Sequence, residues 1–110
     1  MEEINYTVRV SEWGTFWRLD GKRHREDGPA AEWWNGAKWW YRNGRRHRED
    51  GPAIEWHNGD KEWWRHGKLH REDGPAVECA DGYKEWWLHG KQVTEKEHKR
   101  RTSSKVKGEE

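Results

Sequence analysis

The chain of 110 residues has few of the residues that usually build a domain core. Hydrophobic residues make up only 30% of it and charged residues 39%, and Leu, Ile, Val and Phe together number eleven. Such a composition often signals disorder. Two observations argue against disorder: the net charge is only +1, and the chain holds 11 Trp. Each indole can bury about 150–250 Å², so we expect one small domain with a tryptophan-built core.

Cysteine and long apolar runs are also scarce. Cys79 is the only cysteine, which excludes an intrachain disulfide and gives no sign of an oxidising compartment. The first three residues, Met1-Glu2-Glu3, are acidic, and no apolar run approaches the roughly 18 residues that a membrane span requires. We therefore expect no signal peptide and no membrane anchor, and we predict a cytoplasmic location.

One heptad, HREDGPA, occurs three times without change, beginning at His24, His47 and His70. The residues after each copy align as well, so that three units of 23 residues fill positions 24–92 without a gap. A fixed period of this length indicates a tandem repeat protein. On this interpretation residues 1–23 form an N-terminal cap with a partial repeat, and residues 93–110 form a charged tail.

Each repeat contains two turn signals. The first is Asn-Gly or Asp-Gly between short strand-like runs, which predicts a two-residue type I′ hairpin; it stands at Asn35-Gly36, Asn58-Gly59 and Asp81-Gly82. The second follows at Asn43-Gly44, His66-Gly67 and His89-Gly90. The predicted fold is therefore all-β: a tandem hairpin meander with N-terminal capping strands and a short helical or disordered C-terminal tail. Residues 4–10 alternate as a half-buried strand should.

A two-residue turn also fixes which residues face each other. On the predicted core face, Ala31, Ile54 and Val77 stand opposite Trp40, Trp63 and Trp86, with Trp33, Trp56 and Cys79 alongside. Counting through the second turn places His24, His47 and His70 opposite Trp17, Trp40 and Trp63. The other face carries Tyr41, Trp64 and Trp87. Two alternatives stay open for this second face: burial by curling or dimerisation of the sheet, or use as an aromatic groove for a ligand.

The 23-residue period, the two short strands per unit and the order of residues in WWRHGKLHREDGPAVECADG (63–82) resemble the MORN-type repeats. The chain is most similar to the variant with HREDGPA that occurs in small bacteriophage and large-virus proteins. The resemblance covers about residues 15–92. It implies an elongated meander of hairpins that serves as a scaffold or contact surface.

The heptad also holds residue types that carry chemistry, since His24, Glu26 and Asp27 could form an acid-base or metal cluster. Repetition argues against this, because packing contacts recur wherever a backbone recurs whereas a substrate occupies one place. Equivalent positions lie two strands apart, about 9–10 Å, too far for three equivalent imidazoles to bind one zinc ion. We therefore predict no enzymatic activity, no metal and no cofactor. The heptad is interpreted as a structural joint, in which histidine packs on tryptophan and arginine pairs with Glu or Asp.

Two hypotheses for function follow from the residues and the resemblance. In the first, the chain is a non-enzymatic interaction protein, such as a phage protein that binds and inhibits a host immune protein. Its interface residues would be Trp34, Tyr41, Trp64 and Trp87, with Arg45, Arg46 and Lys68, because Trp, Tyr and Arg concentrate binding energy at interfaces.

In the second hypothesis the chain binds a nucleotide or nucleic acid. The indole rings would stack on bases, while Arg45, Arg46, Lys68 and Lys91 hold phosphates. The basic tail KEHKRRTSSKVK (96–107) favours this hypothesis. Self-association into a homodimer also stays open, because terminal hairpins can expose sheet edges that pair between copies.

Overall fold

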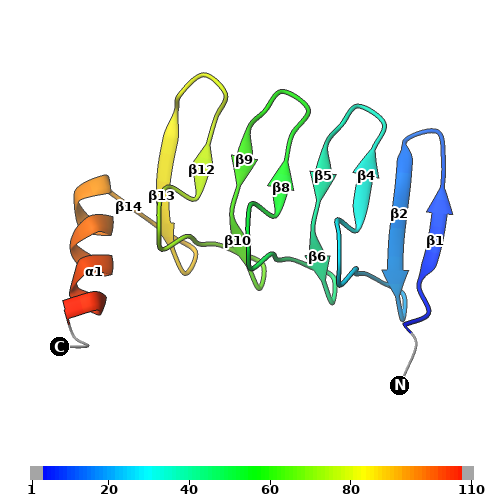
Figure 1. Cartoon of the computed structure of the whole chain (residues 1–110), viewed down its shortest axis with the longest axis horizontal. Coiled ribbons are helices and arrows are strands. Elements are labelled where there is room, and N and C mark those ends of the chain that lie inside the picture. The colour runs from blue at the N-terminus through cyan, green and yellow to red at the C-terminus, as the bar shows by residue number, and fades with distance from the viewer. Residues whose placement is uncertain (1–3, 108–110) are drawn as a thin grey trace.

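A computed structural model describes residues 4–107 and consists mostly of antiparallel β-strands, with one helix at the C-terminal end. The hairpins stand side by side in chain order, so the N-terminal strands and the helix lie at opposite ends (Figure 1). The molecule is thin, with extents of 46 × 39 × 18 Å. The predicted all-β class is confirmed, with the helix as its one non-β element in the described residues.

The strands of the main sheet and its ends are β1 (Thr7–Val10), β2 (Gly14–Leu19), β3 (Lys22–Arg23), β4 (Ala31–Trp33), β5 (Lys38–Trp39), β8 (Ile54–Glu55), β9 (Lys61–Glu62), β12 (Val77–Glu78), β13 (Lys84–Leu88) and β14 (Lys91–Val93). Two further hairpins are formed by β6 (Tyr41–Arg42) with β7 (Arg45–Arg46), and by β10 (Trp64–Arg65) with β11 (Lys68–Leu69). The helix α1 spans Glu95–Lys107.

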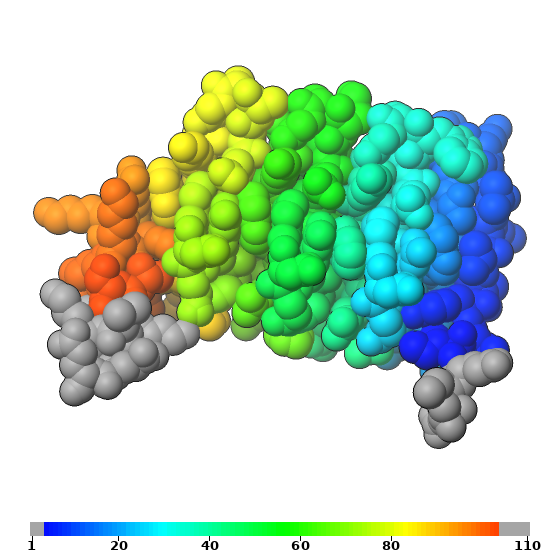
Figure 2. Space-filling model, in the orientation of Figure 1, coloured from blue at the N-terminus to red at the C-terminus, as the bar shows by residue number. Residues whose placement is uncertain are grey.

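The main sheet runs in the order β1-β2-β4-β5-β8-β9-β12-β13-β14, with β3 paired to β2. Neighbours in this order are also neighbours in the sequence, apart from the short hairpins between them. Each hairpin therefore contacts only the next ones along the chain, and the surface is divided into bands that follow the chain from end to end (Figure 2). Such a sheet has two broad faces and no enclosed interior.

The first turn of each hairpin has three residues rather than the predicted two. The backbone N–H of Trp33 donates to the carbonyl of Ala37 at 2.9 Å, so residues 34–36 form the connection. Gly36 is left-handed (φ +99°), whereas Asn35 is not. This is the three-residue hairpin with a glycine bulge, not a type I′ turn. The Asn35 side chain stabilises it by accepting the backbone N–H of Ala37 at 2.9 Å.

The other two hairpins have the same turn, with φ of +97° at Gly59 and +98° at Gly82, and with Asn58 and Asp81 accepting the backbone N–H groups of Asp60 and Tyr83. The extra turn residue shifts the strand register by one position. The partners of Ala31, Ile54 and Val77 are Trp39, Glu62 and Glu85, and the predicted Trp40, Trp63 and Trp86 are wrong. A one-residue shift moves side chains to the opposite face, so Trp40, Trp63 and Trp86 do not share the predicted core face, whereas Ala31 and Ile54 are buried as predicted.

The second turn is the type I′ turn. Asn43 and Gly44 both have positive φ (51° and 80°), and Tyr41 pairs with Arg46 across them. The register predicted through this turn is confirmed: the backbone N–H groups of His24, His47 and His70 donate to the carbonyls of Trp17, Trp40 and Trp63 at 3.3, 3.2 and 3.0 Å.

The centre of the sheet is filled by small side chains rather than by tryptophan. Ala30, Ala31, Ala53 and Ala76 are fully buried, and Ile54 is the one large side chain in the described residues that is almost completely buried. The indoles of Trp33, Trp39, Trp40 and Trp63 are half-buried over them. A structure only 18 Å thick has one layer of side chains on each face, so its large rings keep an exposed edge.

The two ends of the sheet differ. All four residues of β1 are exposed, so the predicted half-buried alternation is wrong, because no second layer covers this edge strand. At the other end α1 packs on β13. Thr94 caps the helix by accepting the N–H of Glu97 on its Oγ1 at 3.1 Å. His98, a residue of this helix, is buried, and its Nε2 donates to the carbonyl of Arg71 at 2.7 Å.

Candidate functional site

Each heptad histidine links two neighbouring hairpins. Nδ1 of His24 accepts the backbone N–H of Asn43 at 2.8 Å, and Nδ1 of His47 accepts that of His66 at 2.9 Å. Nδ1 of His70 accepts the N–H of residue 89 at 2.9 Å. Each donor is the left-handed first residue of a type I′ turn. The imidazole therefore fixes the turn of the following hairpin against the heptad.

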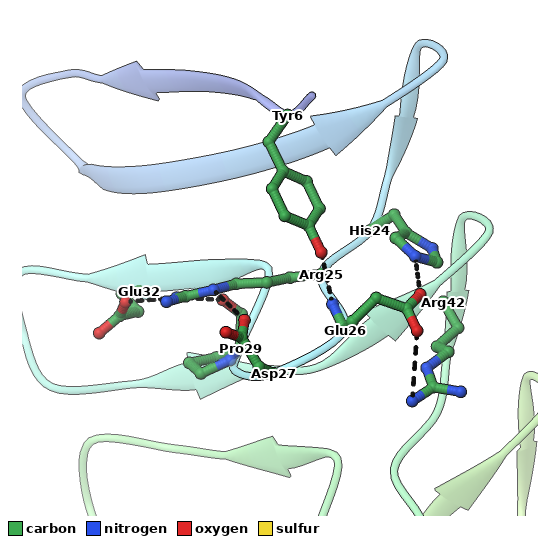
Figure 3. A network of polar contacts seen from close by, with 8 residues as sticks. All are labelled: Tyr6, His24, Arg25, Glu26, Asp27, Pro29, Glu32 and Arg42. Carbon is green, nitrogen blue, oxygen red and sulfur yellow. Dashed lines mark hydrogen bonds and ion pairs between the residues drawn. The ribbon is translucent and has the colours of Figure 1, made fainter. Parts of the chain in front are cut away.

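This hydrogen bond also fixes the proton of the ring. A ring nitrogen that accepts a hydrogen bond carries no proton, so a neutral imidazole must hold its proton on Nε2. Nε2 of His24 contacts Oε2 of Glu26, and Nε2 of His47 contacts Oε2 of Glu49 (Figure 3 for His24). Burial lowers the pKa of His47, while the carboxylate of Glu49 acts in the opposite direction. The neutral ring, donating through Nε2, satisfies both contacts.

His47, Glu49 and His66 are the one group of possible metal ligands that come together among residues 4–107, with ligand atoms within 4.8 Å of one another. A zinc ion needs the lone pair of a histidine nitrogen. In His47, Nδ1 already accepts the N–H of His66 and Nε2 holds the proton, so binding of a metal by His47 would break one of these bonds. The cluster fits a hydrogen-bonded joint better than a metal site, and the absence of a metal stays a prediction.

The heptad arginine, rather than the histidine, stacks on the tryptophan. The guanidinium Cζ atoms lie 3.8–3.9 Å from the indole centroids in the pairs Arg25 on Trp17, Arg48 on Trp40 and Arg71 on Trp63. Glycine leaves room on the other side, since a Cβ on Gly51 would lie 2.9 Å from Cζ of Arg48 and would displace the guanidinium. The flat guanidinium fits between glycine and indole, while the ring contacts of His24, His47 and His70 are with Tyr6, His66 and His89.

The same arginines have their charge matched within the fold. Arg25 pairs with Glu32 at 3.1 Å and donates to the carbonyl of Pro29 at 3.2 Å (Figure 3). Arg48 pairs with Asp50 at 3.0 Å and holds the pKa of that carboxyl below its usual value. We call this side of the sheet the arginine face; it consists of Trp17, Arg25, Glu32, Trp40, Arg48, Glu55, Trp63, Arg71 and Glu78.

The opposite side carries a continuous row of aromatic rings. Phe16 contacts Trp33, Trp33 contacts Trp39, and Trp39 contacts Trp56, with centroids 5.0, 5.0 and 5.4 Å apart. A second row belongs to the same face, because Trp56 and Trp64 donate to the two oxygens of Glu62 at 2.8 Å. We call this side the aromatic face; it consists of Phe16, Trp33, Trp39, Tyr41, Trp56, Glu62, Trp64, Tyr83, Glu85 and Trp87.

Charge is distributed unevenly along the aromatic face. Towards the C-terminal end, Glu62 accepts two indole N–H groups, and Glu85 accepts Trp87 Nε1 and the hydroxyl of Tyr83 at 2.8 and 2.7 Å. In the N-terminal unit the corresponding position, 23 residues before Trp39 and 46 before Glu62, is Phe16. Arginines stand beside it instead, and Arg23 lies over the rings of Phe16 and Tyr41 at 5.3 and 5.6 Å.

The structure separates the predicted interface residues into three places. Tyr41, Trp64 and Trp87 lie half-buried on the aromatic face, and Arg46 joins them with its guanidinium 4.8 Å from the ring of Trp64. Trp34 is 61% exposed at a hairpin tip, where it donates to the carbonyl of Ser11. The last two, Arg45 and Lys68, are exposed at the second-turn edge beside Gly67 and Gly90.

The row of rings on the aromatic face formed by Phe16, Trp33, Trp39 and Trp56 was not predicted from the sequence. Trp33 and Trp56 were assigned to the core, and Phe16 and Trp39 were not singled out. The sequence does contain a signal for this row, because Trp39 occupies a position that is Glu in the next two repeats. It could not be used without the correct register.

Comparisons of the chain with protein-family models, with curated proteins and with solved structures find no match. Within residues 4–107, the helix is neither long nor apolar enough to span a bilayer.

Proposed function

We propose that the protein is a non-enzymatic repeat protein of MORN-like architecture that binds a protein partner through its aromatic face. The observation that carries the proposal is the contrast between the two faces. On the arginine face, each heptad arginine stacks on an indole and meets a carboxylate, so its positive charge is already matched. The aromatic face presents rings with an exposed edge and few charges, which is the composition of an interface core.

The architecture is supported by the recurrence of equivalent strands. The strands β4, β8 and β12 begin at residues 31, 54 and 77, each 23 residues after the one before. Equivalent arginine-indole and histidine-amide contacts recur in each unit. A surface built from stacked units is extended and regular, as binding surfaces of repeat proteins are. The resemblance of HREDGPA to viral repeats suggests that the partner is a host protein whose activity is blocked, such as an immune effector.

The test is capture of a partner by the intact tagged chain from a host lysate treated with nuclease, followed by titration with the purified partner. Trp56→Ser changes a ring that is 39% exposed in the aromatic face, and we expect it to weaken binding at least tenfold. The matched control is Lys61→Ser, an exposed residue paired with Glu55, a member of the arginine face. Equal loss of binding in both variants, with both folded, would contradict the proposed face.

The second candidate is binding of nucleic acid along the second-turn edge. It is favoured by Arg45 and Lys68, which are exposed at this edge beside Gly67 and Gly90, and by Arg46, whose guanidinium lies 4.8 Å from the ring of Trp64. Phosphate contacts release counterions, so binding to a single-stranded oligonucleotide should weaken steeply as salt rises. An affinity for protein that is nearly constant between 50 and 300 mM salt would favour the first candidate.

A further inference from the structure

The N-terminal end of the sheet contains a hollow of about 440 Å³ that shares only Phe16 with the aromatic face. It is lined by Thr7, Arg9, Ser11, Trp13, Phe16, Arg18 and Arg23. These residues come from the first three strands and the turn that joins the first two. The volume is within the range of small-molecule sites, roughly 300–1,000 Å³.

Three guanidinium groups line this hollow without an anion. Arg18 of β2 is the strand partner of Arg23 in β3. Arg9 of β1 is the strand partner of Phe16, which lies two residues before Arg18 in β2. Like charges directly opposite each other destabilise a pair of strands. Among the described residues, no carboxylate lies within ion-pair distance of Arg9, Arg18 or Arg23.

The contrast with the heptad arginines shows that this is a special arrangement within this chain. Arg25, Arg48 and Arg71 each have a carboxylate partner at 3.4 Å or less. At the position of Arg18, the next three units have Tyr41, Trp64 and Trp87. The N-terminal unit therefore replaces an aromatic ring by a cation and lacks the neutralising Glu62 or Glu85.

The hollow also offers a flat apolar surface and two hydroxyl groups. Trp13 is 65% exposed. A planar ligand stacked on this indole would restore the apolar contact that the exposed ring lacks. Its backbone N–H is fixed by Ser11 Oγ at 3.1 Å, which holds the turn that carries the ring. The side chains of Thr7 and Ser11 add polar atoms at the rim.

We propose that this hollow binds a small ligand that carries a phosphate group and a planar ring, the chemical class to which the nucleoside monophosphates belong. Guanidinium groups hold the phosphate through paired N–H donors. The ring stacks on the indole of Trp13, as bases stack on exposed aromatic side chains. The proposal depends on the residues of the hollow alone and does not require that the aromatic face binds a protein.

Isothermal titration of the full chain with adenosine 5′-monophosphate tests the site. We expect saturable binding of one equivalent, and at least tenfold weaker binding of adenosine and of inorganic phosphate. Arg18→Gln and Trp13→Ala should each weaken binding of the monophosphate at least tenfold. The matched control is Arg65→Gln, which removes an exposed arginine outside the hollow and outside both candidate binding surfaces and should leave the affinity unchanged.

The remaining outcomes overturn the proposal. No binding at millimolar ligand, or binding that Arg65→Gln weakens as much as Arg18→Gln, would show that the hollow is not the site. Binding of inorganic phosphate as tight as that of the monophosphate would show that the ring of the ligand does not stack on Trp13. Urea midpoints of all three variants within the error of the parent chain ensure that a loss of binding reports on the hollow. Capture of the protein partner is measured separately and should be unaffected by Arg18→Gln.

Discussion

Nδ1 of His47 accepts the backbone N–H of His66 at 2.9 Å, nineteen residues further along the chain. The bond joins the heptad of one repeat to the left-handed turn residue of the same repeat's second hairpin, and it can form only while the ring is unprotonated on Nδ1. Similar bonds are made by His24 and His70. The repeated imidazole is thus explained by its position in the fold.

The first prediction concerns acid stability. The pKa of His47 in the folded chain lies below its ordinary value of 6.5 because burial penalises the charged ring. The unfolded chain therefore binds the proton more readily, and unfolding is favoured as the pH falls. The stability that His47 contributes should be fully present above pH 6.5 and lost as the pH drops through the folded pKa.

The measurement is the urea midpoint between pH 5 and 8. His47→Asn keeps an acceptor for the N–H of His66 but does not titrate, so the fall in midpoint below pH 6.5 should be smaller. His57→Asn changes an exposed histidine and should keep the slope of the parent chain. A slope that is the same in all three proteins would contradict the role of His47.

The second prediction compares an indole and an arginine taken from two equivalent stacks, Arg71 on Trp63 and Arg48 on Trp40. Trp63→Ala removes a large half-buried ring and should cost about 3–5 kcal/mol of the free energy of unfolding. Arg48→Ala, in the same repeat, removes the cation-π contact with Trp40 and an ion pair, which together are worth about 1–2 kcal/mol. Urea midpoints decide the order, and a larger loss for Arg48→Ala would show that charge rather than aromatic packing dominates this face.

The third prediction separates steric from conformational demands on glycine. A Cβ on Gly14 would lie 2.2 Å from the carbonyl oxygen of Glu32, a backbone atom that cannot move alone. Gly36 has open space around it, but its φ is +99°. Gly14→Ala should therefore separate β2 from β4 and cost several kcal/mol, whereas Gly36→Ala should cost about 1–2 kcal/mol. Thermal unfolding followed by circular dichroism checks the order.

The fourth prediction tests the carboxylate that joins the two aromatic rows. Glu62→Ala removes the acceptor of the indole N–H groups of Trp56 and Trp64, which should cost about 1–2 kcal/mol because water replaces part of the loss. Glu62→Gln keeps one acceptor oxygen and should cost about half as much. Lys61→Ala, exposed on the neighbouring position, serves as the control. Urea midpoints that rank Lys61→Ala with Glu62→Ala would contradict this role.

Part of the fold could be predicted residue by residue. Asn43-Gly44 and its equivalents indicate a second turn, and counting through it correctly places His24 opposite Trp17. The first turn could not be predicted in the same way. Asn-Gly is compatible both with a two-residue type I′ turn and with a three-residue turn that ends in a glycine bulge. The two differ by one residue, and that difference reverses which tryptophans share a face.

The candidate site depended on that difference. Tyr41, Trp64 and Trp87 were predicted on one face and lie together, but that face also holds Trp39 and the predicted core residues Trp33 and Trp56. The hollow between Arg9, Arg18 and Arg23 has no sequence signal, because the three arginines belong to separate strands.

The sequence by itself determined the all-β class and the positions of the turns. Glycine and asparagine tolerate the positive φ that turns require, and proline fixes its own φ, so these residues act locally. Tertiary structure alone decided the register of the first hairpins, the stacking of Arg48 on Trp40, and the end that α1 covers. These features depend on contacts between residues far apart in the chain, and such contacts form only when the hairpins pack together.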